Sequence, residues 1–287
     1  MRAVAEREPF SMAAAGGELA GWRRGEGERV LLLHGGPGMG YEYFDSIADE
    51  LGEGFALASF QQRGLEPSTT AGPFTVAQAL ADIAAVLDGL GWERAWIAGH
   101  SWGGHLALRA AAALADRVHG ALAIDPLGIA GDGGRAAFEA ELVARTPRVG
   151  RERARQLDAR AQTGQDTPEE IVESLQIVWP AYFADPEHAP PMPPVRLGLA
   201  PYEGLTADIT GEGDPQRDRE ILARGEVPYG VVAGAASPIP WGQAARASAE
   251  LSPAAFLVVV PGAGHFPWLE SPGSVRAALV RLIQSAR

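Results

Sequence analysis

Ser101 lies where its hydroxyl could act as a nucleophile. It is the central residue of Gly99-His100-Ser101-Trp102-Gly103, a G-x-S-x-G sequence that follows the apolar run AWIA at 95–98 and precedes an alanine-rich segment typical of a helix. In a strand–turn–helix of this kind, the sharp turn presents the serine above the sheet, and the flanking glycines avoid Cβ clashes. The motif and its setting therefore predict that Ser101 attacks an electrophilic carbonyl.

A serine nucleophile needs a base, and His265 is the candidate. It follows the apolar run FLVVV and the loop PGAG, which places it just past the C-terminal end of a predicted strand. It is also the last histidine in the chain, which suits the order Ser…Asp/Glu…His. We expect the other histidines to hold loops (His34, His100), to lie on the surface (His119, His188) or, for His105, to lie on a helix face that the sequence leaves open.

Two backbone N–H groups could stabilise the oxyanion formed by such an attack. One belongs to Trp102, directly after the serine, and the other to Gly36 in HGGPG at 34–38. Two donors aimed at the developing charge are the usual arrangement for acyl transfer. The alternative for HGGPG is a tight turn after a strand with no chemical role.

HGGPG at 34–38, GHSWGG at 99–104 and GAGHF at 262–266 together resemble the α/β-hydrolase superfamily, and more narrowly its proline iminopeptidase-like branch. The resemblance spans almost the whole chain. That branch commonly shows D-x-R-G-x-G-x-S, where this chain has QQRGLEPS at 61–68. Gln61 in place of Asp and Glu66 in place of Gly weaken the expectation of peptidase specificity.

The resemblance implies an acid after the next-to-last strand, but that position holds Ser237 in the stretch VVAGAASPIP at 231–240. A hydroxyl does not stabilise an imidazolium as a buried carboxylate does. We expect Asp125 to replace it, because it ends GALAID, the strand after the nucleophile helix, and strand ends on that side face the site. Certain haloalkane dehalogenases are known to place their acid at the end of this strand. Their nucleophile is an Asp, and this chain has Ser101 at that position, so we do not expect dehalogenase chemistry.

Other assignments of the acid remain open. Asp125 could instead only cap the turn before Pro126, and Asp214 and Glu270 are weaker rivals by position. If Asp125 is the acid, position 237 no longer has to supply a carboxylate, and we expect the Ser237 side chain to contribute little to turnover.

The elements that position these residues alternate between strand and helix. Apolar runs predict strands at 29–34, 55–60, 95–98, 120–124, 227–233 and 255–260, and helical periodicity or composition lies between them. This pattern predicts an α/β protein with a mostly parallel central sheet flanked by helices, whose site lies at the strand C-termini. Residues 128–224 lack an apolar strand and predict an inserted helical cap, with the hydrolase core at 1–127 and 225–287.

The cap offers aromatic residues near proline-rich turns. Trp179, Tyr182 and Phe183, with Tyr202, could line an apolar substrate pocket, or they could pack the cap onto the core. The iminopeptidase resemblance implies cap carboxylates that hold a substrate ammonium, for which Glu169, Glu173 and Glu203 are available.

Composition narrows the class of protein. A net charge of −12 over 287 residues argues against nucleic-acid or anionic-membrane binding, and the absence of cysteine excludes disulfides and a thiolate nucleophile. No signal peptide or membrane-length apolar run is visible, so we expect a cytoplasmic protein without a membrane partner. The oligomeric state stays open.

These observations predict a serine hydrolase that cleaves an ester or amide of a small molecule through an acyl-enzyme, with no metal or organic cofactor. A carboxylesterase or lactonase competes with an iminopeptidase-like aminopeptidase. The alternatives are a C–C bond hydrolase of the same fold and a ligand-binding sensor with weak turnover, which the missing carboxylate at 237 would favour.

Overall fold

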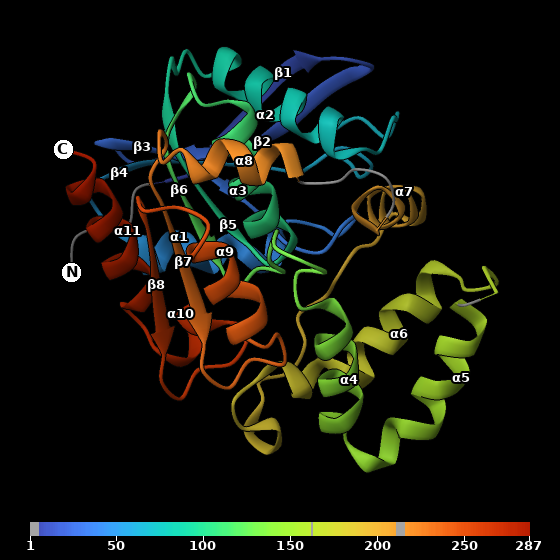
Figure 1. Ribbon diagram of the computed structural model, residues 1–287. Coiled ribbons are helices and arrows are strands. Elements are labelled where there is room, and N and C mark those ends of the chain that lie inside the picture. Colours follow the sequence, from blue (N-terminus) through green and yellow to red (C-terminus); the bar gives the residue numbers. More distant parts are fainter. Residues whose placement is uncertain (1–5, 162, 211–215) are drawn as a thin grey trace.

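A single eight-stranded sheet forms the centre of the molecule (Figure 1). The computed structural model describes residues 6–161, 163–210 and 216–287. The strand order is β1-β2-β4-β3-β5-β6-β7-β8, with β3 to β8 parallel and the hairpin β1–β2 joined antiparallel to β4. The strands are β1 (Glu8–Ala14), β2 (Gly17–Arg24), β3 (Glu28–Leu33), β4 (Phe55–Phe60), β5 (Ala95–His100), β6 (Val118–Ile124), β7 (Tyr229–Gly234) and β8 (Ala255–Val260).

Helices cover both faces of the sheet and create two apolar layers. Alternate β3 residues face opposite layers, since Leu31 and Leu33 pack in one cluster while Val30 and Leu32 pack in the other. The first layer receives α2 (Val76–Gly89), α3 (Trp102–Ala113) and α8 (Gln216–Ala223), and the second receives α1 (Ser46–Leu51) and α11 (Ser274–Ser285). Burial of the strands on both faces explains why they appear in the sequence as continuous apolar runs.

A helical lobe projects beyond the C-terminal end of the sheet (Figure 1). It contains α4 (Arg135–Arg145), α5 (Arg151–Ala161) and α6 (Pro168–Val178), and α7 (Leu199–Thr210) lies between this lobe and the core. The α6 helix starts with a capping box in which Thr167 and Glu170 satisfy each other's backbone N–H. The structure places α8 against α3, where Asp218 pairs with Arg109. The limits of the cap, 128 and 224, remain a prediction.

Short helical turns complete the chain. They are η1 (Glu42–Asp45), η2 (Arg148–Gly150), η3 (Trp179–Tyr182), η4 (Pro186–His188), η5 (Gly242–Arg246), α9 (Ala247–Ala249) and α10 (Pro267–Glu270). The α/β-hydrolase fold with a mostly parallel sheet is confirmed, whereas the hairpin β1–β2 was not anticipated. None of the described helices is long and apolar enough to cross a membrane.

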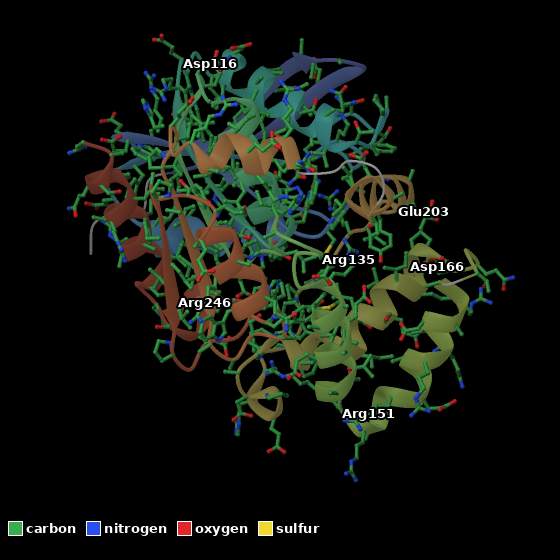
Figure 2. All side chains as sticks on the ribbon, viewed as in Figure 1. Asp116, Arg135, Arg151, Asp166, Glu203 and Arg246 are labelled. Atoms are coloured by element: carbon green, nitrogen blue, oxygen red, sulfur yellow. The ribbon has the colours of Figure 1, made fainter. Side chains whose placement is uncertain are left out.

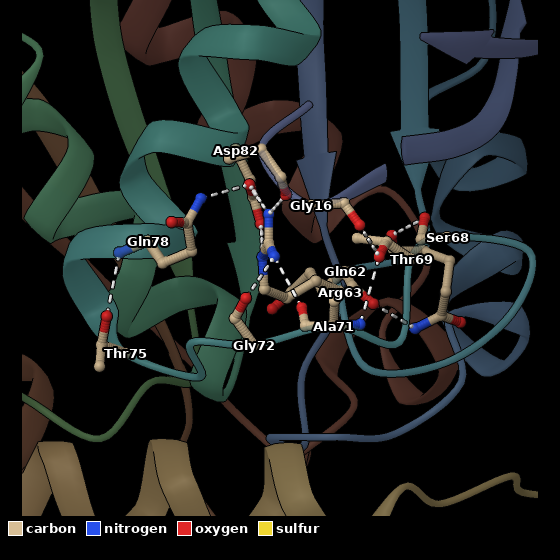
Figure 3. Close-up of polar contacts among 12 residues, drawn as sticks. Gly16, Gln62, Arg63, Ser68, Thr69, Ala71, Gly72, Thr75, Gln78 and Asp82 are labelled. Atoms are coloured by element: carbon tan, nitrogen blue, oxygen red, sulfur yellow. Dashed lines mark hydrogen bonds and ion pairs between the residues drawn. The ribbon is translucent and has the colours of Figure 1, made fainter. Parts of the chain in front are cut away.

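A buried ion pair supports the loop after β4 (Figure 3). The Arg63 guanidinium forms two hydrogen bonds to the Asp82 carboxylate, at 2.6 and 2.7 Å, and both side chains are only 4% exposed. The same guanidinium donates to the carbonyls of Ala71 and Ala15. It therefore joins the loop, helix α2 and the β1–β2 turn, which keeps the Arg63-Gly64 turn in place near the site.

We expect Asp82→Ala to lower the free energy of unfolding by about 3–5 kcal/mol, because it leaves the buried Arg63 charge without its partner. Urea denaturation measures this change. The matched control is Glu152→Ala, which removes the partner of Arg155 in an exposed pair on the cap, where we expect little change. A loss at position 82 no larger than the loss at position 152 would contradict this role of the pair.

Candidate active site

Ser101 occupies a strained turn between β5 and α3. Its backbone lies at φ 54° and ψ −117°, a conformation that non-glycine residues rarely adopt. A Cβ at Gly99 would overlap the Gly103 carbonyl, and one at Gly103 would overlap the Leu33 carbonyl, so strand and helix approach closely only because both residues are glycine. The turn leaves Ser101 partly exposed at the C-terminal edge of the sheet, as the motif predicted.

The structure brings the other two predicted residues together. The Nδ1 atom of His265 lies 2.6 Å from the Asp125 Oδ2 atom, and the residues are 5% and 1% exposed. Asp125 follows β6 at φ 43°, an unusual angle for a residue with a side chain. The prediction that Asp125 faces His265 from the end of its strand therefore agrees with the geometry, although β7 lies between β6 and β8, so their strands are not direct neighbours. The purely turn-capping alternative does not explain the contact.

Position 237 is also part of this contact. The Ser237 hydroxyl donates to Asp125 Oδ2 at 2.5 Å and accepts from the N–H of Ile239 at 3.1 Å. The Gly234 N–H donates to the other carboxylate oxygen at 3.0 Å. Ser237 thus supports the relocated carboxylate, a contact that the sequence did not predict, and its effect on turnover stays a prediction.

Burial and hydrogen bonding shift the pKa of Asp125 in opposite directions. Burial raises the pKa of Asp125 to about 8, although the donations from Ser237 and Gly234 act to lower it. Burial also lowers the pKa of His265. Because the two groups lie within hydrogen-bond distance, they titrate as one unit, and the lowered pKa of His265 favours a neutral imidazole.

A second histidine, His100, forms a hydrogen bond with the His265 backbone. The His100 ring bonds the His265 carbonyl through Nε2 at 2.9 Å and the Tyr43 hydroxyl through Nδ1 at 2.9 Å. Because the His265 carbonyl can only accept, the neutral His100 ring carries its proton on Nε2, and its Nδ1 accepts from the Tyr43 hydroxyl, which itself accepts from the Gly35 N–H. Burial lowers the pKa of His100 well below its ordinary value, which keeps it neutral and confirms its expected loop-holding role.

His34 and Gln62 link the HGGPG loop to the residue after the nucleophile. The Gln62 amide donates to the His34 carbonyl at 2.9 Å and accepts from the Trp102 indole N–H at 2.8 Å. Burial lowers the pKa of His34 to about 4. The sequence suggested a loop role for His34 but gave no signal for Gln62 or Tyr43.

The two predicted oxyanion donors flank this region. Trp102 is the first residue of α3, where backbone N–H groups lack an acceptor within the helix. Gly36 has φ 65°, and a Cβ there would overlap the Met39 side chain. Their role in binding an oxyanion stays a prediction.

The aromatic cap residues divide into two groups. The Tyr182 ring packs against the His265 ring, with 5.0 Å between the ring centroids, and its contact with a substrate stays a prediction. Trp179 and Phe183 are buried and pack against Phe266, which fits the alternative that they hold the cap on the core.

The carboxylates considered for a substrate ammonium face solvent. Glu169 and Glu203 are exposed, and Glu173 forms an exposed ion pair with Arg153; Glu203 lies on α7 in Figure 2. Asp214 falls outside the described residues.

The remaining histidines lie away from the pair. His119 and His188 are exposed as predicted, and His105 is buried against Trp102.

The sheet order and the strained serine turn, with a helical lobe beside them, are typical of the α/β-hydrolase class of fold. The chain belongs to the alpha/beta hydrolase family, whose pattern it matches over residues 30–278.

Known proteins of this class resemble the chain to different extents. Epoxide hydrolase B of Mycobacterium tuberculosis is 32% identical over 102 residues, which are 34% of this chain and only 29% of that protein. Proline iminopeptidase of Mycobacterium smegmatis has a similar structure, with a TM-score of 0.68, 21% identity, and 97% and 99% of the two chains covered. A thermophilic esterase from Thermogutta terrifontis gives a TM-score of 0.64, 22% identity, and coverage of 98% and 99%. At these identities the solved structures establish the shared fold.

The Ser237 contact predicts a measurable change in titration. We expect Ser237→Ala to raise the pKa at which the Asp125–His265 pair takes up a proton by about one unit, because the hydroxyl stabilises the carboxylate most when the imidazole is neutral. Histidine NMR titration measures this pKa without a substrate. Ser285→Ala, at the exposed end of α11, is the control, and equal titration of both variants would contradict the assignment.

Proposed function

We propose that this protein is a serine hydrolase that cleaves an ester bond of a small molecule through an acyl-enzyme. The 2.6 Å contact between His265 Nδ1 and the buried Asp125 carboxylate carries the proposal. It supplies the charge partner that the sequence lacks at position 237, and it leaves Nε2 of the same ring as the basic nitrogen.

In the proposed reaction, the Ser101 oxygen attacks the substrate carbonyl and its proton passes to His265 Nε2. Asp125 stabilises the resulting imidazolium, which then protonates the leaving alcohol as the C–O bond breaks. Water attacks the acyl-enzyme with the same histidine as base, and this step releases the acid and restores Ser101. The N–H groups of Gly36 and Trp102 would stabilise the oxyanion in both steps.

Ester cleavage fits the cap better than aminopeptidase activity does. An aminopeptidase must bind a substrate ammonium, yet Glu169 and Glu203 face solvent and Glu173 is paired with Arg153. Tyr182, which lies beside His265, instead offers an aromatic surface. The similarity to a thermophilic esterase is consistent with this preference, although that similarity by itself concerns the fold.

The sensor alternative loses its main support. It rested on the absent carboxylate at position 237, whereas Asp125 contacts His265 from β6 with three donors around it. Hydrolysis of a C–C bond would use the same residues, and no contact among the described residues of the cap favours it.

A fluorophosphonate probe tests the nucleophile. We expect covalent labelling at Ser101 in the folded protein and none in Ser101→Ala, with the modified residue located by mass spectrometry.

We also expect Asp125→Asn to lower turnover by about 10³–10⁴, because an amide does not stabilise the imidazolium. Absence of labelling, or near wild-type turnover in the Asp125 variant, would refute the respective assignment.

A substrate panel tests the bond type. We expect hydrolysis of short-chain p-nitrophenyl esters with kcat/KM well above that for proline arylamides, since the cap carboxylates are not placed to bind an ammonium. The reverse preference would favour the aminopeptidase alternative. Ser101→Ala provides the blank for both substrate classes.

A further inference from the structure

A single peptide group of the cap lies between two charged side chains near the proposed catalytic residues. This group joins Phe183 and Ala184, in the segment that follows η3. Its carbonyl accepts from Arg145 Nη2 at 2.6 Å, and its N–H donates to Glu270 Oε1 at 2.8 Å. The peptide is therefore held from both ends of its dipole by charge-assisted hydrogen bonds, which are stronger than neutral ones.

The other terminal nitrogen of Arg145 and the other carboxylate oxygen of Glu270 each bond a loop that carries a residue of the Asp125–His265 site. Arg145 Nη1 donates to the Ala236 carbonyl at 2.5 Å, directly before Ser237. Glu270 Oε2 accepts from the Gly264 N–H at 2.7 Å, directly before His265. Arg145 and Glu270 thus connect one peptide of the cap to the backbone on either side of the carboxylate–imidazole contact.

Further backbone contacts make this connection continuous. The His265 N–H donates to the Tyr182 carbonyl at 2.7 Å, and the Ala236 N–H donates to the Ala263 carbonyl at 2.9 Å. A Cβ at Gly264 would overlap the Tyr182 carbonyl oxygen. The cap segment therefore lies directly on the histidine loop, and glycine at 264 is what permits the approach.

We propose that Arg145 and Glu270 are positioning residues that couple the cap to the Asp125–His265 contact, with the Phe183–Ala184 peptide as the link between them. The proposal rests on the proposed function for its effect on rate, but its structural part concerns only the alignment of the two residues. Arg145 acts through the backbone of the Ser237 loop. Its charge is not among the groups that shift the pKa of Asp125.

Loss of Arg145 and loss of Glu270 should displace different residues of the site. Loss of Arg145 frees the Ala236 carbonyl, which allows the Ser237 hydroxyl to move away from the Asp125 carboxylate. Loss of Glu270 frees the Gly264 N–H and lets His265 shift. Because misplacement of a reacting group by about 1 Å can cost 10²-fold in rate, either loss should slow the reaction of Ser101 while the nucleophile itself remains intact.

The chain supplies a matched control for each residue. Arg117 also donates to two backbone carbonyls, those of Trp92 and Glu93, but it precedes β6 and so lies at the opposite end of that strand from Asp125. Glu50 also accepts from backbone N–H groups, those of Gly273, Val275 and Arg276, at the start of α11. Arg117→Ala and Glu50→Gln therefore remove bonds of the same chemistry at places remote from the Phe183–Ala184 peptide.

The test compares Arg145→Ala, Arg145→Lys and Glu270→Gln with these controls. We expect the first and third to lower the rate of fluorophosphonate labelling at Ser101 by about 10- to 100-fold, and to alter the His265 Nδ1 proton signal in NMR. Arg145→Lys keeps one donor group, so its labelling rate should fall less than that of Arg145→Ala. Both controls should have the labelling rate and the Nδ1 signal of the wild type. Unfolding by urea identifies any variant that fails to fold, in which case the lysine variant decides.

A double variant distinguishes coupling from independent damage. If Arg145 acts through the Ser237 loop, adding Ser237→Ala to Arg145→Ala should slow labelling by less than the product of the two single effects. Folded Arg145 and Glu270 variants that keep the wild-type labelling rate and Nδ1 signal would overturn the inference. Failure of the wild type itself to label would instead refute the proposed serine mechanism, and an altered Nδ1 signal would still support the coupling.

Discussion

The burial of the Asp125 carboxylate is the constraint on which the rest of the site depends. A carboxylate that is 1% exposed loses its hydration, and the cost is tolerable only where hydrogen-bond donors replace the water. Here the donors come from the His265 ring, the Ser237 hydroxyl and the Gly234 N–H. Three loops at the sheet edge must therefore keep their relative positions for these donors to reach the carboxylate.

The sheet makes this arrangement possible because β6, β7 and β8 are adjacent and parallel. Asp125 follows β6, Ser237 follows β7 and His265 follows β8, so all three emerge at the same edge. An acid after β7, which is next to β8, and an acid after β6, one strand further along, can thus serve the same histidine. The hydroxyl that remains after β7 supports the carboxylate that comes from β6.

Much of the fold could be predicted from the sequence, because strands buried on both faces appear as continuous apolar runs and the turns carry glycine. The hairpin β1–β2 was missed because β1 is half exposed and its sequence, EPFSMAA, has no strong apolar run. Helices α7 and α8 lie near proline-rich or charged sequence, where packing against the core outweighs the local pattern.

The site was predictable where a motif fixes the position of a residue, as for Ser101 and His265, and where strand order limits the choice, as for Asp125. The roles of Gln62, Tyr43 and Arg145 arise from contacts between distant segments, and no local pattern reports the direction of these side chains. Ser237 belongs to the same group. Its hydroxyl could be assigned only once the distance to Asp125 was known.

The central claim is that the carboxylate serving His265 comes from β6. The most direct measurement is the proton NMR signal of His265 Nδ1, which a short hydrogen bond to a carboxylate moves far downfield. We predict a downfield signal in the wild type that is lost or moved strongly upfield in Asp125→Asn, while Ser237→Ala retains it at a shifted position. An unchanged signal in folded Asp125→Asn would contradict the account.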